Sequence, residues 1–452
     1  MKIRGLSEEN FFEEISVSKA ANRHSVCKIR QRLADENFAA YQNAVGKTVS
    51  VELDSGRPIF FGEVAEVFIE QTFRGSYVEV TAVSFSQKND AAAVTRIFQK
   101  PAKVFGEILN SARLKLQGSE LVLEEKFAAK PCREIILQNG ETDFEFMRRL
   151  AEWQGRRVWV QDTWQSGCKL KIAARSDESE GKISQNEIIS LKIGRRGKIR
   201  TAELVARKYF ELGRVLNLAE NPSKFLIVAL EVYEDGGAER VRFELEEFLE
   251  PALAAELRTP LVKLRAKVLE TADGKNLGRI RVQFEVEDMD AQKSWLPYRT
   301  PYSGIIFLPE IGDTVEVFYS GGECYVGNIL RTTPLDAEFR NVVDKYLGNN
   351  RRQRIFFREK SLEIKSLETS ILLDEKKIEL TAGANKIILD ERGITLKTGG
   401  AFLSEVAKDF TSKAGGKIAL DGGGNVAVKS GGKFEASASG VAAIKGSAVE
   451  LG

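Results

Sequence analysis

Residues 415–440 read GGKIALDGGGNVAVKSGGKFEASASG. Glycine, alanine and serine dominate this stretch, a composition typical of a flexible linker or a disordered tail. The few apolar residues are nevertheless evenly spaced, because Ile418 and Val426 lie eight positions apart, and so do Leu420 and Val428. A fixed period is the signature of a repeat architecture, in which each repeat is one small structural unit. The spacing therefore predicts a regular shaft where the composition predicts a linker.

The same frame continues upstream, so that eleven octads run from Leu362 to Ile444 without an insertion. Each octad carries its apolar residues at two positions, i and i+2, which point to one face of an extended strand. A turn of glycine or polar residues then reverses the chain. The positions that depart from the apolar pattern are Ser370, Lys386, Ser404 and Ser412.

One chain of this kind is not expected to fold alone, because about two apolar side chains per octad are too few to offset the entropy of ordering eight residues. The octads predict that three identical chains wind into an intertwined triple-stranded β-helix, or β-prism, whose ladder pairs between chains and leaves few open edges. One glycine per octad is expected at a corner that requires positive φ or close approach. The predicted trimer core comprises Ile378, Leu380, Ile388, Ile394, Leu396, Phe402, Phe410, Ile418, Leu420, Val426, Val428, Phe434 and Ile444.

Two other repeat or loop structures fit the glycines less well. A phosphate-binding loop requires G-x-x-x-x-G-K-[ST] after a strand, and this stretch has no lysine in that frame. A calcium-binding β-roll requires recurring G-G-x-G-x-D, whereas DGGGN at 421–425 occurs once. The change from Phe434 to Ala436 and Ala442 indicates a shaft that tapers toward its end.

The residues before the shaft predict a mainly β protein in series with it. Alternating apolar and polar residues predict a β-rich hub over residues 1–250, with a few helices. The clearest helix is expected at 139–155, where Thr142 and Glu145 form a capping box and Gly155 ends the helix. Five strand candidates with glycine and proline turns predict an OB-fold barrel over 261–335. The segments 251–260 and 336–360 are expected to be a linker and a neck, and 361–452 the octad-repeat spike.

Composition narrows the functional classes. The chain has 452 residues, with 67 Lys and Arg against 65 Asp and Glu, which gives no general case for nucleic acid or an anionic membrane. The N-terminus lacks the apolar region of a signal peptide, so assembly is expected in the cytoplasm. Four widely spaced cysteines are expected to be buried in a reducing environment, and His24, the single histidine, is expected to be structural or solvent-facing.

The order of hub, OB barrel and octad prism resembles the valine-glycine-repeat (VgrG) spike proteins, which are related to the hub and spike of contractile phage tails. Five segments carry the resemblance: FFGEVAEV (60–67), ILQNGETDFEFMRRLAEWQGRRVWV (136–160), GKNLGRIRVQF (274–284), WLPYRTPYSG (295–304) and FLPEIGDTVEVFYSGGECYVGNIL (307–330). The resemblance implies a structural, non-enzymatic homotrimer without cofactor or metal, at the tip of a contractile injection apparatus. About thirty residues between barrel and prism are too few for an inserted lysozyme domain.

The resemblance also implies the partners. The base would dock on an Hcp-like inner tube and the baseplate, and the tip, at Glu450, Leu451 and Gly452, would carry a PAAR-type cap or separate effectors. Contraction would expel the protein from the cell and drive it transiently through a target membrane, with no role for nucleic acid. Two other hypotheses stay open on the sequence: a phage or tailocin hub-spike that degrades cell wall or polysaccharide, and an OB protein that binds nucleic acid.

Overall fold

The structure, a computed structural model, divides into two compact units, Met1–Pro334 and Leu335–Gly452. It describes residues 1–6, 12–33, 41–100, 102–111, 120–132, 135–163, 167–218, 223–249, 261–271, 273–274, 278–300, 307–320, 323–330, 343–349 and 351–450. The predicted linker at 251–260 and the first part of the predicted neck, 336–342, lie outside these residues. No helix in the described ranges is long and apolar enough to cross a membrane.

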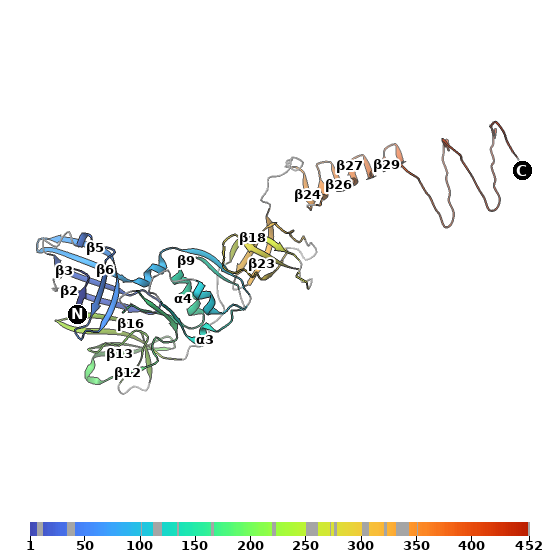
Figure 1. Cartoon of the computed structure of the whole chain (residues 1–452). Coiled ribbons are helices and arrows are strands. Elements are labelled where there is room, and N and C mark those ends of the chain that lie inside the picture. Colours follow the sequence, from blue (N-terminus) through green and yellow to red (C-terminus); the bar gives the residue numbers. More distant parts are fainter. Residues whose placement is uncertain are drawn as a thin grey trace. The chain divides into compact units, whose positions relative to one another are not determined.

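The first unit is built on a twelve-stranded sheet, as the alternating sequence patterns predict (Figure 1). Its alternate side chains form one large core that includes Val17, Ile29, Val80, Leu204 and Phe243. The strands are β1 (Lys2–Arg4), β2 (Phe12–Ala20), β3 (Val26–Leu33), β4 (Thr48–Glu52), β5 (Pro58–Thr72), β6 (Gly75–Ser84), β12 (Glu180–Ile183), β13 (Ile188–Arg196), β14 (Ile199–Ala206), β15 (Val215–Leu218), β16 (Lys224–Asp235) and β17 (Ala238–Glu247).

This sheet consists of two halves with the same strand order. The first half runs β1-β4-β5-β6-β3-β2 and the second β12-β15-β16-β17-β14-β13, so the strands correspond in order. The one difference in direction among these pairs is at the edge, where β1 is antiparallel to β4 and β12 is parallel to β15. The hairpins agree in register as well: Glu66 faces Thr81, and Ala229 faces Glu244, a shift of 163 positions on both strands (66 to 229 and 81 to 244). Each hairpin has a bulge directly before these pairs. The hub is therefore a structural duplication.

A smaller α/β region lies within the hub. The capping box predicted at Thr142 and Glu145 is present, and it begins helix α4, whose Phe146, Met147 and Leu150 are fully buried. Gly155 follows with a φ of +65°, which confirms the predicted end. The elements of this region are η2 (Phe85–Asp90), β7 (Val94–Phe98), α2 (Phe105–Ser111), β8 (Glu120–Leu123), α3 (Glu125–Ala128), β9 (Ile136–Glu141), α4 (Asp143–Trp153), β10 (Arg157–Gln161) and β11 (Lys169–Ala173). The 3-10 turn η3 (Gln185–Glu187) instead connects β12 and β13 of the large sheet.

The five strand candidates after residue 260 form one five-stranded sheet, in the order β21-β19-β18-β22-β23. Val282, Val315 and Val317 are among the side chains that fill its core. Tyr319 is also buried there, and Trp295 lies beneath the guanidinium of Arg281. The strands are β18 (Val262–Glu270), β19 (Arg279–Phe284), β21 (Trp295–Pro297), β22 (Thr314–Ser320) and β23 (Glu323–Leu330). The short strand β20 (Glu287–Asp288) belongs to a separate sheet with β7 and β9.

The hub and this barrel share apolar residues. Ile97 of β7 and Leu137 of β9 are buried in the core of the barrel, and Met289 of the barrel packs against the α/β region of the hub. Strand β20 pairs in parallel with β7, where Asp288 lies opposite Ile97. Because each side contributes side chains to the core of the other, the joint is packed as a protein interior and resists bending.

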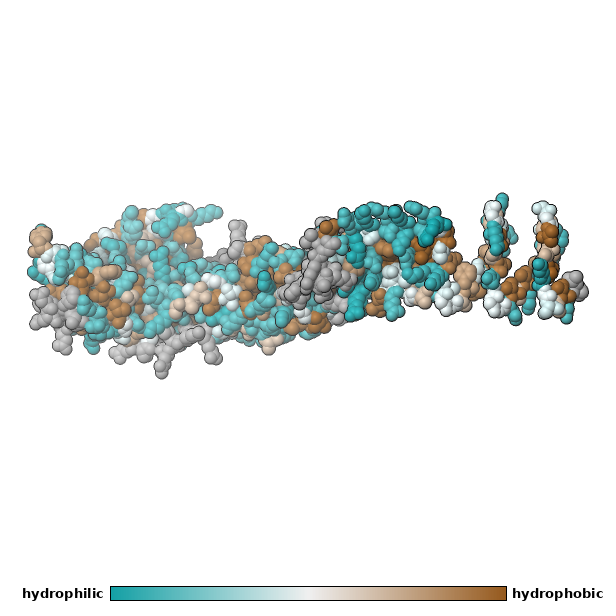
Figure 2. All heavy atoms as spheres, turned by 90° about the horizontal axis from the view of Figure 1, so that it is seen from above, coloured by the Kyte–Doolittle hydropathy of each residue, from teal (hydrophilic) through white to brown (hydrophobic). Residues whose placement is uncertain are grey.

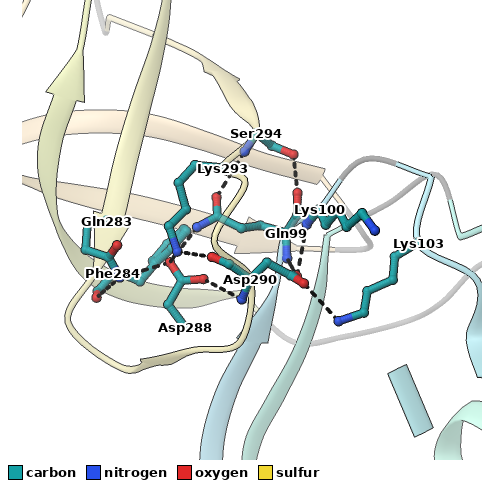
Figure 3. A network of polar contacts seen from close by, with 9 residues as sticks. All are labelled: Gln99, Lys100, Lys103, Gln283, Phe284, Asp288, Asp290, Lys293 and Ser294. Carbon is teal, nitrogen blue, oxygen red and sulfur yellow. Dashed lines mark hydrogen bonds and ion pairs between the residues drawn. The ribbon is translucent and has the colours of Figure 1, made fainter. Parts of the chain in front are cut away.

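A polar network closes over this joint (Figure 3). The carboxylate of Asp290 accepts hydrogen bonds from the backbone N–H groups of Gln99 and Lys100, at 2.8 and 3.0 Å, and from Nζ of Lys103 at 2.8 Å. Lys293 lies 2.8 Å from Asp288. Burial alone would raise the pKa of Asp290, but Lys103 and the two N–H groups hold this pKa below its ordinary value. The network is thus strongest with the carboxylate ionised.

The second unit contains a single antiparallel sheet in which every strand pairs with the next in the chain (Figure 1). Its strands are β24 (Lys345–Gly348), β25 (Gln353–Phe357), β26 (Ser361–Ser366), β27 (Thr369–Asp374), β28 (Lys377–Ala382), β29 (Asn385–Asp390) and β30 (Gly393–Lys397). The prediction that the ladder of the octad repeat pairs between chains is therefore wrong for residues 361–397, where the ladder is internal to the chain.

The joint between hub and barrel yields a prediction for Asp290. Asp290→Ala leaves the nearly buried ammonium of Lys103 without its carboxylate, which should cost about 3 kcal/mol of unfolding free energy at pH 7. Because the folded-state pKa of Asp290 lies below its ordinary value of 3.8, the carboxylate stabilises the protein above that pH and loses this effect as the pH falls. The difference between the two proteins in urea unfolding should shrink below about pH 4.

Glu285→Ala is the matched control, since Glu285 is an exposed acid in the same segment of the barrel. It should change the unfolding free energy by less than about 0.5 kcal/mol. Equal stabilities of the Asp290 and Glu285 variants at pH 7 would contradict the role given to the network.

Candidate functional site

The shaft turns at the interval that the sequence predicts. Strands β26 to β30 begin at Ser361, Thr369, Lys377, Asn385 and Gly393, eight residues apart. Beyond Lys397 no strand is assigned as far as residue 450, but the chain still bends at residues 399–400, 407–408, 415–416, 423–424, 431–432, 439–440 and 447. The octad is therefore a structural unit along the whole described shaft.

Antiparallel pairing gathers aliphatic side chains on one face of the β26–β30 sheet. Residues that lie directly opposite each other on paired strands point to the same face. Two continuous ladders result, and together they form what we call the apolar shaft face. The first ladder is Leu362, Leu373, Ile378, Leu389 and Ile394, and the second is Ile364, Ile371, Leu380, Ile387 and Leu396.

No residue that the structure describes covers the apolar shaft face. The exposed fraction of its exposed residues ranges from 38% for Ile371 to 72% for Ile394, whereas the buried side chains in the core of the hub sheet are at most 8% exposed. The face lines an open groove that continues to Phe402 and Leu403. Figure 2 shows hydrophobic residues at the surface toward the C-terminal end of the chain. A single layer of strands offers no second layer to enclose a core.

The opposite face of the same sheet is suited to water. Glu379 accepts hydrogen bonds from Lys377 at 2.7 Å and from Lys386 at 2.6 Å. These two ammonium groups lower the pKa of Glu379 to about 2. Lys365 and Lys397 lie on this face too, as do the predicted off-pattern residues Ser370 and Lys386. We call it the polar shaft face.

The structure separates the predicted core residues of the sheet. Ile378, Leu380, Ile394 and Leu396 lie together on the apolar shaft face, but Ile388 lies opposite Glu379 on the polar shaft face. The strand direction reverses at every octad, so the positions that share a face alternate between the second and fourth residues and the third and fifth. Sequence reasoning consequently missed Ile371, Leu373, Ile387 and Leu389, which a sixteen-residue period would have indicated.

After Lys397 the sequence repeat changes. Apolar residues occupy the second and fourth positions of successive octads, as in Ile418 and Leu420 and again in Val426 and Val428. If the strand direction reversed at each bend, as in an antiparallel sheet, these pairs would point to alternate faces of the sheet. They face one side in every octad only if the chain winds around an axis. The predicted core residues of this part, all 58% exposed or more, are Phe402, Phe410, Ile418, Leu420, Val426, Val428, Phe434 and Ile444.

The glycines predicted at the corners of the octads fulfil only part of that prediction. Gly416, Gly424, Gly432 and Gly440 each lie at a bend, but none has a positive φ. A Cβ atom at these positions would meet no atom within 4 Å among the described residues of the chain. The backbone conformation of the described residues therefore does not require glycine at these four positions.

The predicted tip lies largely outside the described residues. Glu450 is described and exposed, whereas Leu451 and Gly452 fall beyond the described range.

His24 has the partners of a hydrolytic triad without an accessible nucleophile. Its ring nitrogens lie 2.7 Å from Oγ of Ser86 and 2.6 Å from Asp90, and its ring packs on Phe144. Ser86 is fully buried, so its hydroxyl cannot reach a substrate. This supports the structural interpretation of His24. All four cysteines are buried and free, as predicted, and burial raises the pKa of Cys324 to about 12.

Comparison with known proteins agrees with this architecture. Residues 264–331 match the family described as the type VI secretion system/phage-baseplate injector OB domain. No curated protein matches the chain.

Solved structures resemble the chain at low sequence identity. The c3393 protein of E. coli, described as a component of the type VI secretion system with structural similarity to the T4 tail proteins gp27 and gp5, is 14% identical, with a TM-score of 0.54 over 72% of this chain and 98% of that one. A chain of the lidded PdpA–VgrG complex of Francisella is 7% identical, with a TM-score of 0.56 over 88% of this chain and 79% of that one. Residues 264–331 therefore form an injector OB domain, and the chain has the fold of a VgrG-type spike protein.

Proposed function

We propose that three copies of this chain form the spike at the tip of a contractile injection apparatus. The hub docks on an Hcp-like inner tube and the baseplate, and the shaft carries a PAAR-type cap or separate effectors at its tip. The spike assembles in the cytoplasm, is expelled by contraction and punctures the target membrane. It performs no catalysis of its own.

The observation that carries this proposal is the uncovered apolar shaft face. Covering the exposed part of one half-exposed Leu or Ile is worth about 1 kcal/mol, so the ten residues of this face contribute on the order of 10 kcal/mol per chain. Association costs roughly 4–15 kcal/mol, so the face alone approximately offsets that cost. The exposed residues from Phe402 to Ile444 supply the surplus.

A trimer suits this face because each chain contributes one sheet, which acts as a wall with an apolar side and a charged side. The apolar walls close around a common axis while the polar shaft faces, with Glu379 and its two lysines, remain in water. Beyond Lys397, each chain winds around the same axis, and the corner glycines accommodate the neighbouring chains. Strands hydrogen-bonded across such a shaft resist bending, which suits force applied along one axis.

The proposal predicts opposite results for two neighbouring residues of β28. Leu380 belongs to the apolar shaft face and Thr381 to the polar shaft face. Leu380→Asp buries a charge at the axis and should abolish the resistance of the trimer to heat and detergent, whereas Thr381→Asp should leave it intact. Light scattering gives the mass in solution, and gel mobility without boiling reports the resistance. A wild-type protein of single-chain mass would sink the proposal.

A second prediction concerns catalysis. The purified protein should release no fragments from peptidoglycan or capsular polysaccharide over hours at micromolar concentration. Product analysis by mass spectrometry checks this. Turnover that a single Asp or Glu substitution removes would favour a degradative hub-spike instead, because glycoside hydrolysis depends on a carboxylate pair.

A further inference from the structure

The polar shaft face carries its charged residues in separate columns. Residues that lie opposite one another on successive strands form a column that runs along the shaft. One column, continued onto strand β25, consists of four cations and two hydroxyl residues, and we call it the basic ladder. Its members, in strand order, are Arg354, Lys365, Ser370, Thr381, Lys386 and Lys397. Neighbouring strands lie about 4.8 Å apart, so the ladder is about 24 Å long.

The basic ladder places like charges directly opposite each other. Arg354 lies opposite Lys365 on β25 and β26, and Lys386 lies opposite Lys397 on β29 and β30. Like charges in directly opposed positions destabilise a sheet. The same unfavourable arrangement at both ends of one column indicates that an anion from outside the sheet compensates it.

The acids of the same face compensate only part of this charge. Glu379 pairs with Lys386, but it also pairs with Lys377. Neither Lys365 nor Lys397 forms an ion pair with a residue that the structure describes, and both are exposed. The near balance of bases and acids in the whole sequence therefore does not hold locally, because strand pairing separates the two.

One end of the basic ladder opens into a hollow between two neighbouring turns. The hollow has a volume of about 1000 Å³. Among the residues that line it are three cations, Arg352, Arg354 and Lys365, one acid, Glu368, and the hydroxyl residue Thr369. Guanidinium and ammonium groups are the side chains that bind phosphate most strongly. A phosphate group in this hollow would lie beside the first pair of like charges.

We propose that the basic ladder binds the phosphate headgroups of an anionic lipid surface. This inference rests on the proposed function, in which the shaft enters a membrane and its polar faces point outward. The adjacent column of the same face favours lipid over other phosphate polymers, because it carries the half-buried aliphatic residues Leu372 and Ile388. Aliphatic side chains beside cations fit the boundary between headgroups and acyl chains, whereas a nucleic acid offers no acyl chains.

Vesicle sedimentation with the full-length protein tests the ladder. The probe is phosphatidylcholine vesicles that contain about one-third phosphatidylglycerol, at about 0.1 M NaCl, and pure phosphatidylcholine vesicles are the neutral reference. The protein should bind the anionic vesicles at least ten-fold more tightly than the neutral ones, and about 1 M NaCl should release it. Attachment through the apolar shaft face would not depend on lipid charge, so equal binding to both vesicles would overturn the proposal.

Charge removal tests the position of the site. A cation near an anionic membrane surface strengthens binding about five-fold, so Lys365→Gln with Lys397→Gln should weaken binding to anionic vesicles at least about 25-fold. Lys365→Arg with Lys397→Arg should retain it. The matched control, Lys376→Gln with Arg392→Gln, removes the same net charge from exposed turns at the opposite border of the sheet and should change binding less than about three-fold. An equal loss in the control would show that net charge, and not the ladder, causes the binding.

Two further measurements separate the claims. The mass in solution distinguishes the ladder from the spike: a three-chain particle that does not bind anionic vesicles overturns the ladder and leaves the spike standing. A single-chain particle that binds them overturns the proposed function and leaves the ladder standing. Single-stranded DNA at the same salt concentration tests the choice of partner, and binding to DNA without binding to vesicles would overturn it.

Discussion

The shaft is governed by one constraint: a single layer of strands cannot bury its own apolar face. Ten aliphatic residues lie on one side of the β26–β30 sheet, and the described part of the chain places nothing over them. Contact between water and this apolar face costs free energy, as it does for an exposed hydrophobic core. The opposite face, where Glu379 pairs with Lys377 and Lys386, is stable in water. The two faces together define which side would turn inward in the trimeric spike that we propose.

The change of repeat near Lys397 extends this argument along the chain. Up to that residue, a two-strand unit keeps the apolar residues on one face of an internal meander, so each chain builds its own wall. Beyond it, every octad has the same pattern, and one face is maintained only by winding around an axis. The strands of the chain end at the residue where the pattern changes. In the proposed trimer, the shaft would pass from three separate walls to an intertwined needle.

The sequence predicts turns and local elements better than it predicts pairing. The octad spacing, the capping box at Thr142 and the five strands of the barrel all depend on neighbouring residues, and all are confirmed. The separation of Ile388 from Ile378 depends on strand direction, which the period alone does not reveal. The sequence does not reveal the duplication of the hub, because counterpart residues such as Glu66 and Ala229 are chemically unlike. The sequence does not indicate the role of Asp290 either, because its partner Lys103 lies far away in the sequence.

Amide hydrogen exchange of the full-length protein across residues 415–440 tests the central claim most directly. In one chain these residues form no strand and are exposed, so their amides would exchange within seconds at neutral pH. If three chains wind together, amides near Ile418, Val426 and Phe434 are hydrogen-bonded to other chains and should remain protected for hours. Complete exchange within seconds in the assembled protein would show that this stretch is the flexible tail that its composition indicates.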